Sequence, residues 1–202
     1  MIQLSRIHPR IIETLRTSVE MTDAEVVQCW GRFELIHFKK KDFFLKEGEI
    51  CRLRGYINEG CFRRYTTNMH GKENILHFAI EDWWIGDLES MGSCQPSVYN
   101  IQALEESEVF CISQPEHLRL CNEMPKYFSL HEAKEKRFLY ASLKRLTIAQ
   151  AGTPEEKYLL LARQHPELFQ RIPMHYIASY LGIQPESLSR LRKRLVKKEK
   201  KS

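Results

Sequence analysis

Near its C-terminus the chain places an acidic and several basic side chains at spacings that suit the recognition of DNA bases. Glu186 could accept a hydrogen bond from a cytosine amine, and Arg190, one helical turn later, could donate to O6 and N7 of guanine. Lys193 and Arg194 could instead hold the phosphate backbone, which adds affinity without sequence information. With three polar neighbours, the candidate DNA-contacting residues are Gln184, Glu186, Ser187, Ser189, Arg190, Lys193 and Arg194.

These side chains need a helix to present them, and the residues around them predict two short helices that cross at a tight turn. Ile177 and Leu181 are spaced as i and i+4 on the first helix, and Leu188 and Leu191 as i and i+3 on the second. Gly182 can take a positive φ at the turn, and a proline stands where each helix should begin. We therefore predict a helix-turn-helix; the alternative is an ordinary helical hairpin with a basic, solvated face.

Charge is distributed unevenly along the 202 residues. The net charge is +5, but residues 152–202 hold eleven Lys and Arg against five Asp and Glu, and residues 1–151 are close to neutral. A neutral body with a basic end fits an effector domain joined to a domain that binds a polyanion, here double-stranded DNA. Gly152 can end one helix and Thr153 can cap the next, so we place the boundary between residues 151 and 152.

The first of these domains has the periodicity of short strands. Alternating apolar residues and hairpin turns begin near Phe33, and helices are predicted on either side, over residues 7–31 and after Pro115. This pattern predicts an α+β fold with an N-terminal antiparallel β-barrel or jelly roll. The clearest strands are expected at 53–58, 61–66, 74–78, 99–104 and 108–112.

A long helix is predicted over residues 127–151. Leu139, Leu143 and Leu146 on it keep coiled-coil spacing, whereas its early turns are rich in charged residues. A helix that is exposed on one side and apolar on another favours a partner helix, so we predict a homodimer. The alternative is that the helix packs only against its own barrel.

Several classes of protein are disfavoured by what the sequence lacks. The six cysteines contain no C-x-x-C pair, so free, buried thiols are expected and no metal centre or cofactor is predicted. There is no H-x-H, no zincin helix motif, no G-x-S-x-G and no phosphate loop, so we expect no enzymatic activity. No apolar run approaches the ~20 residues of a membrane span, and the N-terminus lacks a signal-peptide core, so the protein is predicted to be cytoplasmic with no membrane contact.

The order of these features resembles the Crp/Fnr family of bacterial transcription regulators over nearly the whole chain. The resemblance implies a cyclic-nucleotide-binding-like domain, a homodimer joined through the long helix, and recognition helices that contact half-sites one helical turn apart. It also implies RNA polymerase and a small-molecule effector as further partners. Besides the helix-turn-helix, it is carried by Gly48-Glu49, Gly60, Gly71, Ile85-Gly86-Asp87-Leu88 and Ala103-Leu104-Glu105.

The sequence departs from the cassette that holds a cyclic phosphate in nucleotide-binding members. Their pattern resembles F-G-E-L followed by R-[ST]-A, in which a glutamate bonds the ribose and an arginine pairs with the phosphate. Here Asp87 takes the glutamate position and Pro96 the arginine position, and no Lys or Arg lies between Lys72 and Arg119. We therefore predict an effector other than cyclic AMP. The candidate pocket residues are Trp84, Gly86, Asp87, Leu88 and Ser97.

The second helix of the predicted helix-turn-helix also departs from well-known members. These begin that helix with arginine and then glutamate, whereas here Pro185 precedes Glu186 and cannot contact a base. The rival function is therefore a ligand-binding or protein-interaction module that keeps the fold and no longer binds specific DNA.

Overall fold

The computed structural model describes residues 3–199, without the side chains of 144, 145, 147–151 and 196–199. It contains two compact units, one formed by Met1–Thr66 with Leu76–Phe138 and the other by Thr67–Ile75 with Leu139–Ser202. We predicted a boundary between residues 151 and 152, whereas the two units divide the chain between residues 138 and 139. The predicted domain boundary therefore stays a prediction.

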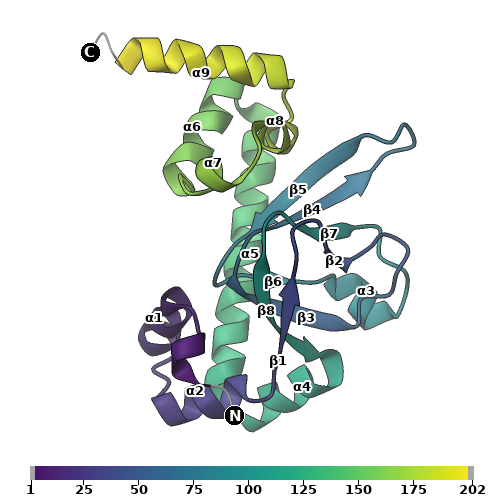
Figure 1. The fold of residues 1–202 in the computed structure, drawn as a ribbon, viewed down its shortest axis with the longest axis vertical. Coiled ribbons are helices and arrows are strands. Elements are labelled where there is room, and N and C mark those ends of the chain that lie inside the picture. The colour runs from purple at the N-terminus through teal and green to yellow at the C-terminus, as the bar shows by residue number, and fades with distance from the viewer. Residues whose placement is uncertain (1–2, 200–202) are drawn as a thin grey trace. The chain divides into compact units, whose positions relative to one another are not determined.

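Within residues 3–199, eight strands form two four-stranded sheets. Figure 1 shows their arrangement in the first unit and the hairpin of β4 and β5. The sheet orders are β1-β8-β3-β6 and β2-β7-β4-β5, and β1, β2, β3 and β4 pair antiparallel with β6, β7 or β8. Side chains from both sheets, such as Ile57, Phe62, Ile101 and Val109, meet in one buried cluster. This confirms the predicted mixture of helices with antiparallel sheets. The strands are β1 (Glu34–Phe38), β2 (Phe43–Leu45), β3 (Leu53–Glu59), β4 (Phe62–Thr67), β5 (Glu73–Ala79), β6 (Trp84–Ile85), β7 (Asn100–Ala103) and β8 (Ser107–Ser113).

Helices flank the sheets of the first unit. They are η1 (Leu4–Arg6), α1 (Pro9–Ser18), α2 (Asp23–Trp30), α3 (Leu88–Ser93), α4 (Gln114–Glu123) and the first half of α5 (Pro125–Ala151). Thr22 opens α2 with a capping box, in which Thr22 N–H donates to the Glu25 carboxylate at 2.7 Å. The long helix begins two residues before the predicted start at residue 127, because a proline such as Pro125 fits the first turn of a helix.

An apolar core fills the space between these helices and the first sheet. Trp30 is fully buried and lies 5.6 Å from the Phe33 ring and 5.8 Å from the Tyr56 ring, measured between centroids. Tyr127 and Leu130 at the start of α5 complete the same cluster. The first half of α5 is therefore a core element of this unit.

The second unit contains the end of α5, α6 (Pro154–Gln164), α7 (Leu168–Arg171), α8 (Met174–Leu181) and α9 (Pro185–Glu199). Ile177, Leu181, Leu188 and Leu191 are buried, as their spacing predicted. Gly182 ends α8 with φ 69°, in the left-handed region. Among the described residues, no helix is long and apolar enough to cross a membrane.

Candidate functional site

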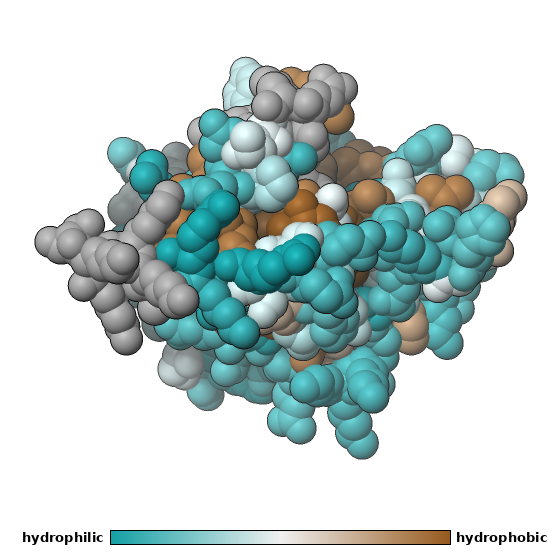
Figure 2. Space-filling model, turned by 90° about the horizontal axis from the view of Figure 1, so that it is seen from above, coloured by the Kyte–Doolittle hydropathy of each residue, from teal (hydrophilic) through white to brown (hydrophobic). Residues whose placement is uncertain are grey.

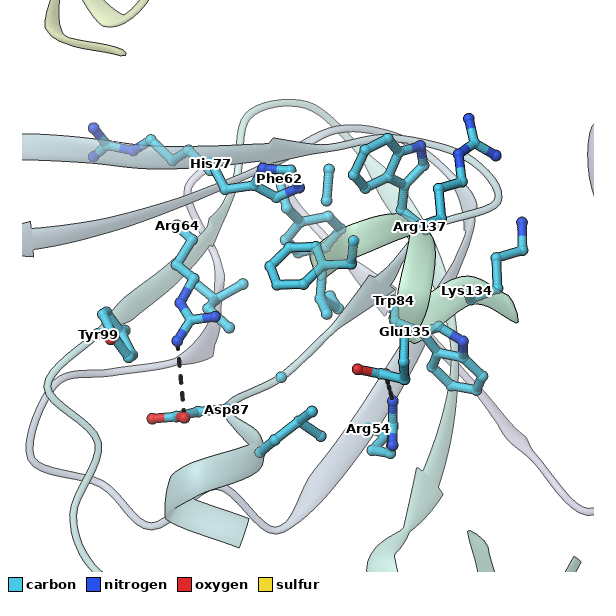
Figure 3. A pocket seen from close by; sticks show the side chains of 18 of the residues that line it. Arg54, Phe62, Arg64, His77, Trp84, Asp87, Tyr99, Lys134, Glu135 and Arg137 are labelled. Carbon is cyan, nitrogen blue, oxygen red and sulfur yellow. Dashed lines mark hydrogen bonds and ion pairs between the residues drawn. The ribbon is translucent and has the colours of Figure 1, made fainter. Parts of the chain in front are cut away.

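The first unit contains a cavity of about 280 Å³ lined by strands β3 to β7, the start of α3 and part of α5 (Figure 3). Most of its exposed wall is apolar or aromatic, and charged side chains reach it from several elements, including β3, β4 and α5. Such a concave surface with a few polar groups is the usual form of a small-molecule site. The apolar and aromatic lining residues are Phe62, Ala79, Trp83, Trp84, Ile85, Leu88, Tyr99, Ile101 and Phe138.

The predicted cassette residues lie at this cavity. Trp84, Gly86, Asp87 and Leu88 line it, whereas Ser97 is not a lining residue. The buried Ser97 hydroxyl donates to Asp87 Oδ2 at 2.6 Å. Asp87 also N-caps α3 by accepting from the backbone N–H of Glu89 at 3.2 Å. The Asp87 carboxylate is therefore already engaged by donors of its own chain.

Arg64 on β4 brings a cation into the cavity, which the sequence argument did not foresee. Its Nη2 lies 3.8 Å from Asp87 Oδ1, and its guanidinium stacks on the Tyr99 ring with Cζ 3.7 Å from the centroid (Figure 3). The conclusion that no cationic side chain is available at the cassette is therefore wrong for the folded chain. The alternation of side chains along a strand could have indicated this position for Arg64. Phe62 and Arg64 are two residues apart, so they share one face of β4.

Arg54 on β3 lies on another wall of the cavity and is held by several groups. It is 4% exposed, and its Nη2 donates to Glu135 Oε1 of α5 at 2.5 Å (Figure 3). Its Nη1 lies 3.3 Å from His117 Nε2, and its guanidinium lies over the Trp84 ring at 4.8 Å. No local signal in the sequence indicates this pair, since Arg54 and Glu135 are 81 positions apart.

His117 extends this polar cluster toward α5. A guanidinium can only donate, so His117 Nε2 must accept from Arg54, and Nδ1 carries the proton that it donates to the Tyr127 hydroxyl at 2.7 Å. Burial is the main cause that lowers the pKa of His117 to about 3, and the charges of Arg54 and His131 contribute to the same shift. His117 is therefore a neutral structural group near neutral pH.

Acidification should destabilise the fold through this histidine. The pKa of His117 is about 3 in the folded chain against an ordinary 6.5, so between these values the unfolded chain binds more protons. Its stabilising contribution is complete above pH 6.5 and is lost as the pH falls toward 3, at up to about 1.4 kcal/mol per pH unit. The free energy of unfolding, measured with urea at each pH across this range, should fall less steeply with decreasing pH for His117→Gln than for the wild-type protein. Parallel curves would contradict the assignment, since the variant should lose the share of the slope that comes from His117 and keep the shares of other groups, such as His131 and Glu25.

Asp82, at the edge of the cavity, accepts bonds from three separate elements. Tyr56 Oη of β3 donates at 2.6 Å and Thr14 Oγ1 of α1 at 3.0 Å, and Lys134 Nζ of α5 forms an ion pair with the carboxylate. Burial lowers the pKa of Lys134, and the neighbouring Asp82 opposes that effect. The backbone of Asp82 has φ 73°, which only a few residue types tolerate. Asp82 therefore joins α1, β3 and α5.

The predicted DNA-contacting residues lie along α9 and the turn before it. Gln184, Glu186, Ser189, Arg190, Lys193 and Arg194 are exposed, and Ser187 is half-buried. Leu188 and Leu191 are buried on the opposite side of the helix, so the polar set faces outward. Viewed from above, with α9 toward the reader, the surface is mostly hydrophilic (Figure 2).

Some side chains of α9 have partners within the chain. Arg194 forms an ion pair with Glu155 of α6, and Arg190 Nη2 donates to Ser187 Oγ at 3.3 Å. A hollow of about 550 Å³ lies beside Ser189, Lys193 and Arg192. Arg192, which was not among the predicted contacts, is exposed and lines this hollow.

On α5, the three leucines predicted to contact a partner are exposed. Leu139, Leu143 and Leu146 have exposed fractions of 54%, 52% and 56%. Tyr140 beside them is also exposed. The structure thus shows an apolar stripe on the described part of α5.

The cysteines differ in part from the expectation of buried thiols. All six are free and four are buried, but Cys121 is half-buried and Cys94 is exposed. Cys94 follows the last turn of α3 in a left-handed conformation with φ 56°, in a loop where the neighbouring side chains are exposed too. The described residues contain no cluster of three His, Cys, Asp or Glu side chains that could hold a metal ion.

The two sheets and the cavity belong to one β-domain, and residues 35–124 of the chain match the family model of the cyclic nucleotide-binding domain. Solved Crp/Fnr-family regulators share the fold. FixK2 from Bradyrhizobium japonicum has a TM-score of 0.68 at 15% identity, covering 83% of this chain and 86% of its own. The c-di-GMP-responsive regulator CLP from Xanthomonas campestris has a TM-score of 0.69 at 12% identity, covering 88% and 93%. Catabolite Activator Protein from Thermus thermophilus has a TM-score of 0.56 at 18% identity, covering 92% and 87%.

No curated protein sequence matches the chain. At these identities the solved structures establish the shared fold. The expected resemblance to Crp/Fnr regulators is confirmed at this level.

Proposed function

We propose that this protein is a DNA-binding transcription regulator of the Crp/Fnr type. It acts as a homodimer whose two helix-turn-helix domains, each formed by α8 and α9, contact half-sites in the major groove. The observation that carries this proposal is the outward face of α9, where polar and basic side chains are exposed above the buried Leu188 and Leu191.

The chemistry of this face supports base recognition together with backbone contacts. Glu186 and Arg190 are both exposed and stand one helical turn apart, so they can address neighbouring base pairs. Arg190 donates a hydrogen bond to Ser187, which positions it without neutralising its charge. Lys193 and Arg192 add positive charge that favours the phosphate backbone. RNA polymerase is a further expected partner of such a regulator.

The β-domain cavity is proposed as the effector site, and cyclic AMP is not its ligand. The arginine position of the nucleotide cassette holds Pro96, which is exposed. The carboxylate that should bind ribose hydroxyls belongs to Asp87, whose oxygens accept from Ser97 and Glu89. Calorimetry that detected micromolar binding of cyclic AMP would overturn this assignment.

Replacing Arg190 with alanine should reduce affinity for the cognate site by ~1–3 kcal/mol and relax selectivity at one base pair. Lys193→Ala is the matched variant, because it removes one exposed charge from the same helix. It should lower the affinity for all DNA sequences equally and make that affinity less dependent on salt concentration. The cognate site is obtained by selecting bound sequences from a random DNA pool, and affinities are measured by fluorescence anisotropy. Equal losses on cognate and random DNA for Arg190→Ala would show that Arg190 does not contact a base. A selection that yields no preferred site would favour the module that no longer binds specific DNA.

A further inference from the structure

We infer that the cavity of the β-domain binds a compact, largely apolar molecule carrying one carboxylate or phosphate group, which is anchored by Arg64 of β4. This inference rests on the proposed function, since it names the chemical class of the effector. The anchor lies outside the cassette segment, on a strand that precedes it in the chain.

Arg64 has donor capacity that its own chain leaves unused. A guanidinium offers five N–H donors, and the Asp87 carboxylate, 3.8 Å away, is too distant for a good hydrogen bond. Its Nε is buried and has no hydrogen-bond partner among the described residues. Stacking on the Tyr99 ring at 3.7 Å fixes the plane of the guanidinium. A planar, oriented group with free donors suits bidentate binding of an oxyanion.

The other cations of the cavity are already engaged or solvated. Arg54 is held by Glu135 and His117, and an anion could take it only by breaking a buried pair. Lys134 is paired with Asp82, and Arg63 binds the Gln102 side chain at 2.7 Å. Arg137 is exposed and lies 5.8 Å from the centre of the Trp83 ring. Displacing the loose Asp87 contact costs least, so Arg64 is the anchor.

The rest of the wall sets the character of the ligand. Phe62, Ile85, Ile101 and Leu88 offer no hydrogen bonds from their side chains, so they favour an apolar body. A cavity of about 280 Å³ lies at the small end of ligand pockets, which favours a compact molecule. A ligand with several hydroxyl groups is disfavoured, because the Asp87 carboxylate already accepts from Ser97 and Glu89.

The test measures binding of simple probes to the purified full-length protein by calorimetry. Benzoate and decanoate represent carboxylates, phenyl phosphate represents phosphates, benzyl alcohol is the neutral counterpart, and cyclic AMP is the hydroxyl-rich anion. Binding of a carboxylate or of phenyl phosphate is expected, with benzyl alcohol and cyclic AMP weaker. The relative affinities of the two anion types decide which group is the natural one.

Arg64→Gln should weaken binding of the preferred anion roughly 10- to 100-fold, because a charge-assisted pair is lost, and Arg64→Lys should restore part of it. Arg137→Gln is the comparison variant, since it removes an equal charge from an exposed lining position and should weaken binding much less than Arg64→Gln. Thermal unfolding shows whether each variant is folded. No binding by any anion, or equal losses in Arg64→Gln and Arg137→Gln, would overturn the inference.

DNA binding measured on the same samples separates this inference from the proposed function. Arg64→Gln should retain affinity for DNA in the absence of a probe. Failure of anion binding with DNA binding intact would reject only the effector class, whereas a wild-type protein that binds no DNA would reject the regulator.

Discussion

Asp82→Ala should lower the free energy of unfolding by about 3–5 kcal/mol, because it breaks a buried ion pair and leaves one partner behind. Lys134 would keep a buried charge with no counterion, and the hydroxyls of Tyr56 and Thr14 would lose their acceptor. Burial and the neighbouring carboxylate raise the pKa of Tyr56 well above its usual value, so its hydroxyl remains a donor that needs an acceptor. Alanine also tolerates the positive φ at this position poorly.

Urea unfolding of three further variants separates these contributions. Asp82→Asn should cost less, because asparagine tolerates the left-handed region and can still accept from Tyr56. Adding Lys134→Met to Asp82→Ala should recover part of the loss, since it removes the stranded charge. Asp23→Ala is the matched control, because the Arg16–Asp23 pair is exposed on the surface and should contribute little. A loss below about 1 kcal/mol for Asp82→Ala would contradict the structural role of this carboxylate.

Leu139→Glu combined with Leu146→Glu should convert the dimer into a monomer and reduce affinity for a two-half-site operator by ~10²–10⁴-fold. The two leucines are seven residues apart, on one side of α5, and more than half of each side chain is exposed. Glutamates at both positions would bury like charges at the proposed dimer contact. A monomer contacts a single half-site, so the gain from joining two contacts is lost.

Sedimentation velocity at micromolar concentration tests the oligomeric state, and anisotropy with one-half-site and two-half-site DNA tests the affinity. Ala141→Glu is the matched control, because residue 141 is exposed and lies about 200° around the helix from residue 139. This variant should remain dimeric. A monomeric wild-type protein, with and without DNA, would refute the dimer, as would a double variant that still sediments as a dimer.

Secondary structure and local caps could be predicted from the sequence because they depend on residues close together in the chain. The Thr22 and Thr153 capping boxes each join residues three apart, and both are present. Strands β3, β4, β5, β7 and β8 follow the alternation of apolar residues, with ends shifted by a residue or two, whereas the two-residue β6 was not predicted. The burial of Ile177, Leu181, Leu188 and Leu191 followed in the same way from helical spacing.

The candidate sites were predictable to different degrees. The polar face of α9 could be placed from sequence, since burial of Leu188 and Leu191 determines which side of a single helix is exposed. The cavity could be placed only in part. Its cassette residues were found by their motif, but Arg64 and Arg54 come from strands that precede the motif in the chain.

Only the tertiary structure decided which charges meet. Asp82 binds Thr14, Tyr56 and Lys134 across 68, 26 and 52 residues, and no local spacing predicts such contacts. The same holds for Arg64, which meets Asp87 and Tyr99 because strand pairing brings β4 beside β7. The sequence alone therefore determined the elements and the basic, outward-facing helix. Only the folded chain supports the inference that Arg64 can bind an anion, because the availability of each charge depends on which distant side chains neutralise the others.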